Sequence, residues 1–180
     1  MCATRWVQKH EAVITLEEII VPVSTALEEI DQWKDKDAAS GAHSLLCAIQ
    51  NSTFLVTLSI LARIMASSLV LSRALQKVQL DLVTAIQYAD QLLSDLTDSR
   101  SRAEEEFAKI YKEASKLATD LGVTLQKPRT TTRQTHRDNV EADTEEEYFR
   151  RSVYIPFLDR FITELLLRNK YYLRLIAATI

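Results

Sequence analysis

The sequence predicts an all-α protein, an elongated helical bundle that contains one very long helix at about 78–121. Only 2 of the 180 residues are Gly and 3 are Pro, too few for the many turns of a β fold. Apolar residues recur at helical spacing along most of the chain, and one four-three repeat is unbroken from Leu82 to Leu121. These observations favour a single helical domain over residues 1–180.

The composition excludes several classes of protein. Gly41 and Gly122 cannot supply the glycines of a P-loop, a dinucleotide-binding loop or a nucleophile elbow. Cys2 and Cys47 are too few for a disulfide scaffold, and the chain does not open with a long apolar leader. We therefore expect an intracellular protein outside these glycine-dependent enzyme classes.

The first helix is expected at 12–33, because the apolar residues of this segment form one broad face. Pro22 lies inside the segment and should kink or split the helix, because proline has no N–H to donate. A charged and polar connector follows and ends at Ser40, whose hydroxyl can cap the next helix.

The second helix, at about 41–65, is apolar on nearly every side and should lie at the centre of the bundle. The overlapping stretch 54–71 is the nearest approach to a membrane span in length and composition. Arg63 lies in its middle and three serines interrupt it, so we expect a buried helix and no contact with a membrane.

The four-three repeat predicts the long helix and a narrow seam for one partner helix. At 1.5 Å per residue this helix would be about 60 Å long, and Gly122 is a natural cap at its C-terminal end. Arg100 is either a polar layer in register or part of a local break at 97–101. Either earlier helices of the same chain or a second copy could pack on the seam. The seam positions are Leu82, Ile86, Ala89, Leu93, Leu96, Arg100, Ala103, Phe107, Ile110, Ala114, Leu117 and Leu121.

Residues 122–143 should form a basic loop between the long helix and the last one. Residues 122–140 contain four Lys or Arg against one Asp or Glu, with hydroxyl side chains between them. Cations and hydroxyls are the groups that contact phosphates. The alternative is that the loop forms salt bridges across the bundle, between two acidic helices. The candidate nucleic-acid contacts in this loop are Lys127, Arg129, Arg133, His136 and Arg137.

The last helix is expected to start at Thr144, whose spacing to Glu147 fits a capping box. Pro156 lies inside this helix and should bend it.

The sequence gives little support for a metal site or for a catalytic site. His43 and Cys47 have the i, i+4 spacing at which two side chains can share a zinc ion. Because no second pair has ligand spacing, we predict neither a metal site nor a cofactor. The acidic runs occur at helix starts, where they complement the helix dipole, and they do not define a catalytic pair.

Several motifs occur in order between Thr4 and Arg168: Thr4-Arg5-Trp6, the segment 71–76, Pro128-Arg129, the segment 133–139 and the segment 148–159. Together they resemble the hAT superfamily of DNA transposases. The likeness is closer to its domesticated relatives, which include the zinc finger MYM-type proteins and a THAP-domain repressor.

The resemblance implies a specific place in such a protein. In the hAT superfamily an RNase H-like fold carries an Asp-Asp-Glu triad for two-metal chemistry, and a helical insertion interrupts that fold. This chain resembles the insertion without the catalytic core, so alone it should not cut DNA. Trp6 matches the family's Arg-Trp motif, whose indole can stack on a flipped base; its alternative role is to cover the bundle. The tail after Arg168 departs from the family pattern.

We therefore expect a non-catalytic helical module that positions DNA or mediates protein interaction. Two alternatives stay open: part of an active Asp-Asp-Glu transposase in a longer chain, and a scaffold unrelated to DNA that dimerises through the 82–121 seam. The expected partners are DNA at the basic loop and either a second copy or the rest of a transposase-like chain. The resemblance implies a nuclear location.

Overall fold

The computed structural model describes residues 3–74, 82–129 and 140–177, and every regular element within these ranges is helical. This confirms the all-α prediction. The elements are α1 (Ala3–Asp31), α2 (Lys36–Ile49), α3 (Ser52–Ala74), α4 (Leu82–Ser101), α5 (Ala103–Asp120), α6 (Glu145–Phe149), the π-helical turn η1 (Arg150–Tyr154) and α7 (Ile155–Ala177).

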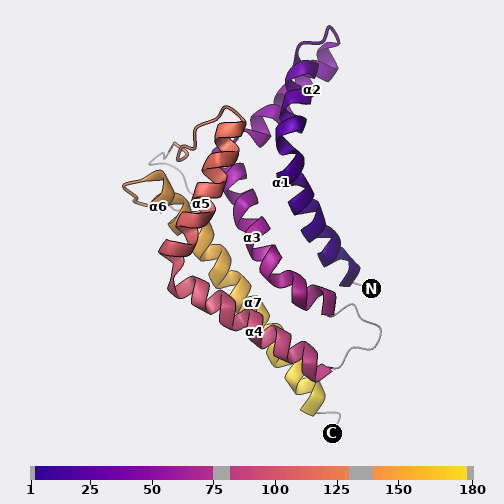
Figure 1. The fold of residues 1–180 in the computed structure, drawn as a ribbon, viewed down its shortest axis with the longest axis vertical. Helices are drawn as coiled ribbons and strands as arrows, with labels where there is room; N and C mark the ends of the chain where they lie inside the picture. The colour runs from indigo at the N-terminus through magenta and orange to yellow at the C-terminus, as the bar shows by residue number, and fades with distance from the viewer. Residues whose placement is uncertain (1–2, 75–81, 130–139, 178–180) are drawn as a thin grey trace.

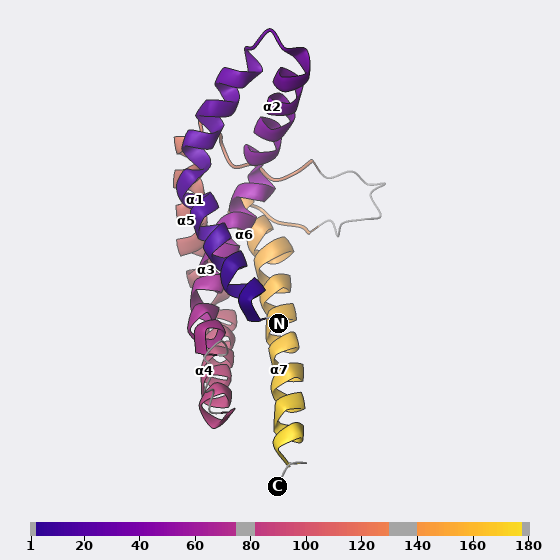
Figure 2. The same ribbon diagram turned by 90° about the vertical axis from the view of Figure 1, so that its right-hand side faces the viewer.

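The helices form an elongated assembly (Figure 1). At one end α1 and α2 make a hairpin, and at the other end α4 lies against α7. Between them α3 packs on both α1 and α5. Figure 2 shows α7 running along one side of the molecule, below the base of the basic loop. The protein thus has a shared centre around α3 and α5, from which two arms extend.

The N-terminal hairpin differs from the sequence prediction at three points. α1 begins at Ala3 rather than at residue 12. α1 continues through Pro22, so the proline does not split it. α2 begins at Lys36 rather than after Ser40, because Asp35 caps it. The Asp35 carboxylate accepts hydrogen bonds from the N–H groups of Asp37 at 3.0 Å and Ala38 at 3.3 Å, which satisfies two N–H groups that the first turn leaves unpaired.

The predicted single helix at 41–65 is wrong, because the chain divides it between α2 and α3. Asn51 lies in the break and caps α3, accepting from the N–H groups of Thr53 at 2.9 Å and Phe54 at 3.3 Å. An asparagine side chain competes with the backbone for such bonds and therefore favours a helix end over a helix interior.

α3 occupies the centre of the bundle, as expected for that part of the sequence. Leu55, Val56 and Ile60 are almost completely buried, and the helix contacts α1, α4 and α5. By length and composition alone α3 could cross a membrane. Central helices of globular bundles have the same composition. In this fold one face of α3 is buried within the chain, including Leu55, Val56 and Ile60, whereas Val70 near its C-terminal end is 60% exposed.

The single long helix predicted at about 78–121 is also wrong. α4 ends at Ser101, α5 begins at Ala103, and Arg102 between them has φ −106° and ψ 32°. The hydroxyl of Ser101 and the N–H of Arg102 both donate to the carbonyl of Asp98, at 2.8 and 3.1 Å. Such side-chain bonds compete with helix propagation. The break turns the chain so that α4 packs on α7 while α5 packs on α3.

α5 ends where the sequence predicts. Gly122 has φ +68°, the left-handed conformation that favours glycine. The N–H of Gly122 donates to the carbonyl of Thr119 at 3.0 Å, and that of Val123 donates to Ala118 at 2.8 Å. These two bonds form a Schellman motif, which stops the helix and starts the basic loop.

The last helical segment begins at the predicted cap. Thr144 Oγ1 accepts a hydrogen bond from the N–H of Glu147 at 3.1 Å. The π-helical turn η1 ends at Tyr154, two residues before Pro156, and its end is marked by a bond from the N–H of Ile155 to the carbonyl of Arg150. A wider turn accommodates the missing N–H of a proline.

The core joins the central helices to the C-terminal segment. Phe107 of α5, Phe149 of α6 and Leu158 of α7 are completely buried. The rings of Phe107 and Tyr154 lie 5.3 Å apart between centroids. Aromatic side chains therefore hold η1 against α5, and α6 contacts η1 in turn. These contacts fix the segment that follows the basic loop.

Candidate nucleic-acid interface at the base of the basic loop

The outgoing side of the basic loop is anchored in the bundle. Leu125 is buried in the core, and the N–H of Gln126 donates to Ser52 Oγ at the start of α3, at 3.0 Å. The next residue, Lys127, donates from Nζ to the carbonyl of Ala142 at 3.2 Å. This last bond joins the outgoing side of the loop to its returning side.

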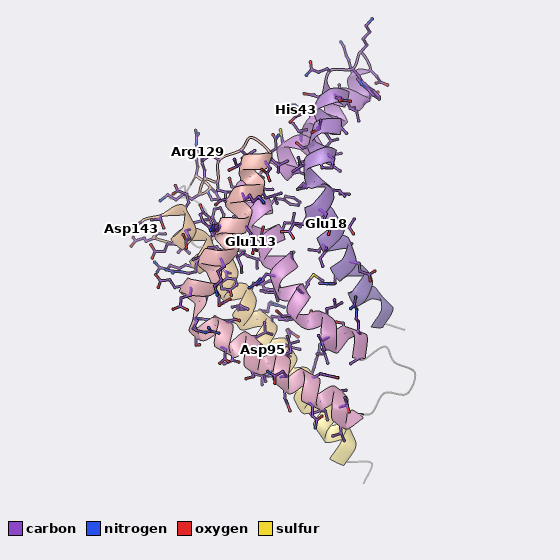
Figure 3. All side chains as sticks on the ribbon, in the orientation of Figure 1. Glu18, His43, Asp95, Glu113, Arg129 and Asp143 are labelled. Carbon is purple, nitrogen blue, oxygen red and sulfur yellow. The ribbon has the colours of Figure 1, made fainter. Side chains whose placement is uncertain are left out.

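The returning side is held by an arginine of η1. Arg151 Nη1 donates to the carbonyl of Glu141 at 2.6 Å and lies 3.3 Å from Glu147 Oε1. Glu147 also accepts the N–H of Asp143 at 3.1 Å. Both ends of the loop therefore leave from one braced base, which Figure 3 shows near the labelled Arg129 and Asp143.

The charge of this base is mixed. Asp143 and three glutamates at the start of α6 lie beside the cations Lys127, Arg129 and Arg151. The hydrogen bond from the backbone N–H of Asp143, followed by the contact with Arg151, lowers the pKa of Glu147. Glu147 is thus used in bracing, and net positive potential must come from the loop itself.

Two of the predicted nucleic-acid residues can be placed in this base. Lys127 is exposed, but its ammonium group donates to Ala142 and so braces the loop. Arg129 is exposed at the point where the described chain leaves the base. Arg133, His136 and Arg137 lie outside the described residues.

The structure does not bring Trp6 to the basic loop. Its backbone lies in the first turns of α1, and its side chain is outside the described part of the chain. The N-terminal end of α1 lies on the opposite side of the molecule from Arg129 (Figures 1 and 3). A nucleic acid could contact both only by extending across the bundle.

The alternative interpretation of the basic loop is that its cations form salt bridges across the bundle. Such a contact does occur near the base. Arg150 of η1 lies 3.4 Å from Glu104 of α5. This pair, however, uses an arginine outside the loop. Lys127, the loop cation whose partner is defined, binds a carbonyl rather than a carboxylate.

No group of three or more His, Cys, Asp and Glu side chains within the described ranges is arranged to hold a metal ion. His43 and Cys47 do approach each other, with 3.7 Å between Nε2 and Sγ. Sequence reasoning found that pair but missed a third residue: Asp31 Oδ2 lies 3.5 Å from His43 Nδ1. Only the hairpin packing of α1 on α2 brings Asp31 there, so no spacing rule could have found it.

The amino-acid sequence of the chain is similar to that of two known proteins. The chain is 25% identical over 171 residues to the human 52 kDa repressor of the inhibitor of the protein kinase. The mouse protein of the same name is 23% identical over 172 residues. This chain is similar to a repressor protein. The match covers 92% of this chain but 22% of either relative, so the chain spans about a fifth of their length. No family model and no solved structure matches the chain.

Proposed function

We propose that the chain is a non-catalytic helical module of a repressor derived from a hAT transposase, and that its basic loop contacts the phosphate backbone of DNA. The observation that carries this proposal is the similarity to the repressor, which extends over nearly the whole chain. Because 92% of the chain is aligned, the loop in its middle lies within the related region. A nuclear location follows from this proposal.

The braced base supports a role for the loop in binding. Lys127 and Arg151 hold its two ends through backbone carbonyls, at 3.2 and 2.6 Å. Ends that are fixed before binding reduce the entropy that a loop loses on contact with a ligand. Arginine is suited to the contact because its planar guanidinium matches the geometry of a phosphate.

The test is the salt dependence of binding to a mixed-sequence DNA duplex, measured on the full chain. Replacing Arg129, Arg133 and Arg137 with Ala should weaken binding and reduce the slope of log K against log salt by up to about 2.7, since each lost phosphate contact removes about 0.9. The loop would have no role if the triple variant kept the wild-type affinity and slope.

A matched control removes three cations elsewhere. Lys34 and Lys36, beside the turn between α1 and α2, and Arg160 on α7 are all exposed. Their replacement with Ala changes the net charge by the same amount, yet it should leave the slope unchanged. Equal losses in the two triple variants would mean that the total charge, rather than the loop, attracts DNA, and this would contradict the proposal.

A catalytic role within a longer chain is the second candidate. The chain corresponds to 22% of each relative, so the chemistry of an Asp-Asp-Glu transposase would belong to a longer protein. The test is metal-dependent cleavage of DNA by that longer protein. If cleavage persists after the cations of the basic loop are replaced, this candidate is favoured over the repressor module.

Dimerisation without DNA is a third candidate. Val83 on α4 and Leu166 and Leu167 on α7 expose 60, 49 and 60% of their surfaces, which leaves apolar surface on the arm. In contrast, Phe107 and Ile110 of the seam are buried within the chain. A dimer would therefore have to use α4 and α7 rather than the whole seam. Sedimentation equilibrium that gives a monomer at every concentration would exclude it.

A further inference from the structure

Three side chains with distinct chemistry are aligned on the hairpin of α1 and α2. The thiol of Cys47 lies 3.7 Å from Nε2 of His43, one helical turn earlier on α2. The other ring nitrogen, Nδ1, lies 3.5 Å from Oδ2 of Asp31 at the end of α1. Figure 3 labels His43 on this hairpin, away from the base of the basic loop.

The order of these contacts assigns a role to each group. A neutral imidazole carries one N–H and one free acceptor nitrogen. A carboxylate only accepts, so Asp31 favours the proton on Nδ1 and leaves Nε2 of His43 as the acceptor that faces the thiol of Cys47. A nucleophile, a base in reach of it and a third group that orients the base form an activated site.

The site is open to reagents in solution. Cys47 is exposed, and the side chain of His43 keeps 65% of its surface accessible. Cys47 lies in the last turn of α2, where the helix dipole disfavours a negative charge. The imidazole of His43 is the basic group that contacts the thiol, so the reactivity of Cys47 should depend on His43 rather than on the helix.

We propose that Cys47 is a thiol–disulfide exchange site for small disulfides such as oxidised glutathione. His43 takes the proton of the thiol, and the Cys47 thiolate attacks one sulfur of the disulfide. A new disulfide joins Cys47 to one half of the reagent, and the other half leaves as a thiolate that takes the proton back from His43. Asp31 is a positioning residue, and no further oxidant is needed.

The experiment measures the rate at which oxidised glutathione modifies the full chain, with mass spectrometry of the peptides that contain Cys47 and Cys2. Cys2 is a second thiol in every sample and serves as an internal reference. His43→Gln should slow modification of Cys47 about tenfold, less than the roughly 100-fold of a buried general base, because the site is exposed. The rate at Cys2 should not change.

Asp31→Asn tests the positioning role, with the exposed Glu29→Gln in the same region of α1 as its control. For Asp31→Asn, the pH profile of Cys47 modification should lie between the profiles of the wild type and of His43→Gln. For Glu29→Gln, the profile should match that of the wild type. Equal rates at Cys47 in the wild type and His43→Gln would overturn the proposal. A wild-type pH profile at Cys47 that coincides with that of Cys2 would also overturn it.

Discussion

Arg100 of α4 and Asp159 of α7, which are 59 positions apart in the chain, form a two-pronged ion pair. Nε of the arginine lies 2.6 Å from Oδ1, and Nη2 lies 3.3 Å from Oδ2. The hydrogen bond with Asp159 raises the pKa of Arg100. The polar residue that interrupts an otherwise apolar seam thus connects the two helices of the C-terminal arm.

This pair should contribute modestly to stability. Both side chains are partly exposed, at 38 and 53%, so water screens their attraction. A double-mutant cycle with Arg100→Ala and Asp159→Ala should give a coupling free energy of about 0.2 to 1 kcal/mol, decreasing with added salt. The measurement is urea unfolding of the four proteins. A coupling of zero at low salt would show that the two prongs do not persist in solution.

The two glycines should respond oppositely to alanine. Gly122 has φ +68°, so Gly122→Ala should destabilise the chain by about 1 to 2 kcal/mol, the cost of the left-handed conformation for an L residue. Gly41 lies inside α2 with open space around it, so Gly41→Ala should stabilise by up to about 1 kcal/mol. Thermal unfolding distinguishes the two, and shifts in the same direction would contradict the assignment of these backbones.

The cap of α3 is a third test. Asn51→Ala removes two hydrogen bonds to the backbone and should lower the free energy of unfolding by about 0.5 to 2 kcal/mol. Asn51→Asp keeps an acceptor at the helix start and should retain most of that stability. If the alanine variant were as stable as the wild type, α2 and α3 would be continuous in solution, as the sequence alone suggests.

Glu17 of α1 should make stability depend on pH. Burial raises the pKa of its carboxyl above the ordinary 4.5, and the charges of Glu113 and Glu18 raise it further. The folded chain therefore holds this proton more tightly than the unfolded chain. The resulting stabilisation is complete below pH 4.5 and is lost as the pH rises through the folded-state pKa.

Glu17→Gln should therefore raise the stability at pH 7 and weaken its pH dependence just above 4.5, as measured by urea unfolding at several pH values. The exposed Glu28→Gln on the same helix is the control and should change neither quantity. A lower stability of Glu17→Gln at pH 7 would mean that the charged carboxylate is favourable in the fold.

The helices themselves could be predicted because their causes are local. Helical spacing of apolar residues and the scarcity of Gly and Pro led to the all-α fold, and the caps at Thr144 and Gly122 were correct. The errors fell at interior breaks. The apolar pattern continues across Asn51, and beside Arg102 only Arg100 interrupts it, whereas the regular helix stops at both Asn51 and Arg102.

The candidate sites show the same division. Lys127 and Arg129 could be chosen from a run of basic residues. The hydrogen bond from Lys127 to the carbonyl of Ala142 could not be predicted from that run. Similarly, the spacing of His43 and Cys47 was visible, whereas Asp31 joined them only through the packing of two helices.

The sequence by itself determined that the chain is helical, where a basic loop interrupts it and how two of its helix ends are capped, because these depend on neighbours a few positions apart. The tertiary structure decided where the predicted long helix breaks, that α5 packs on α3 while α4 packs on α7, and that Arg100 meets Asp159. Those outcomes depend on which surfaces can be buried together across the whole chain, and a local pattern holds no information on that choice.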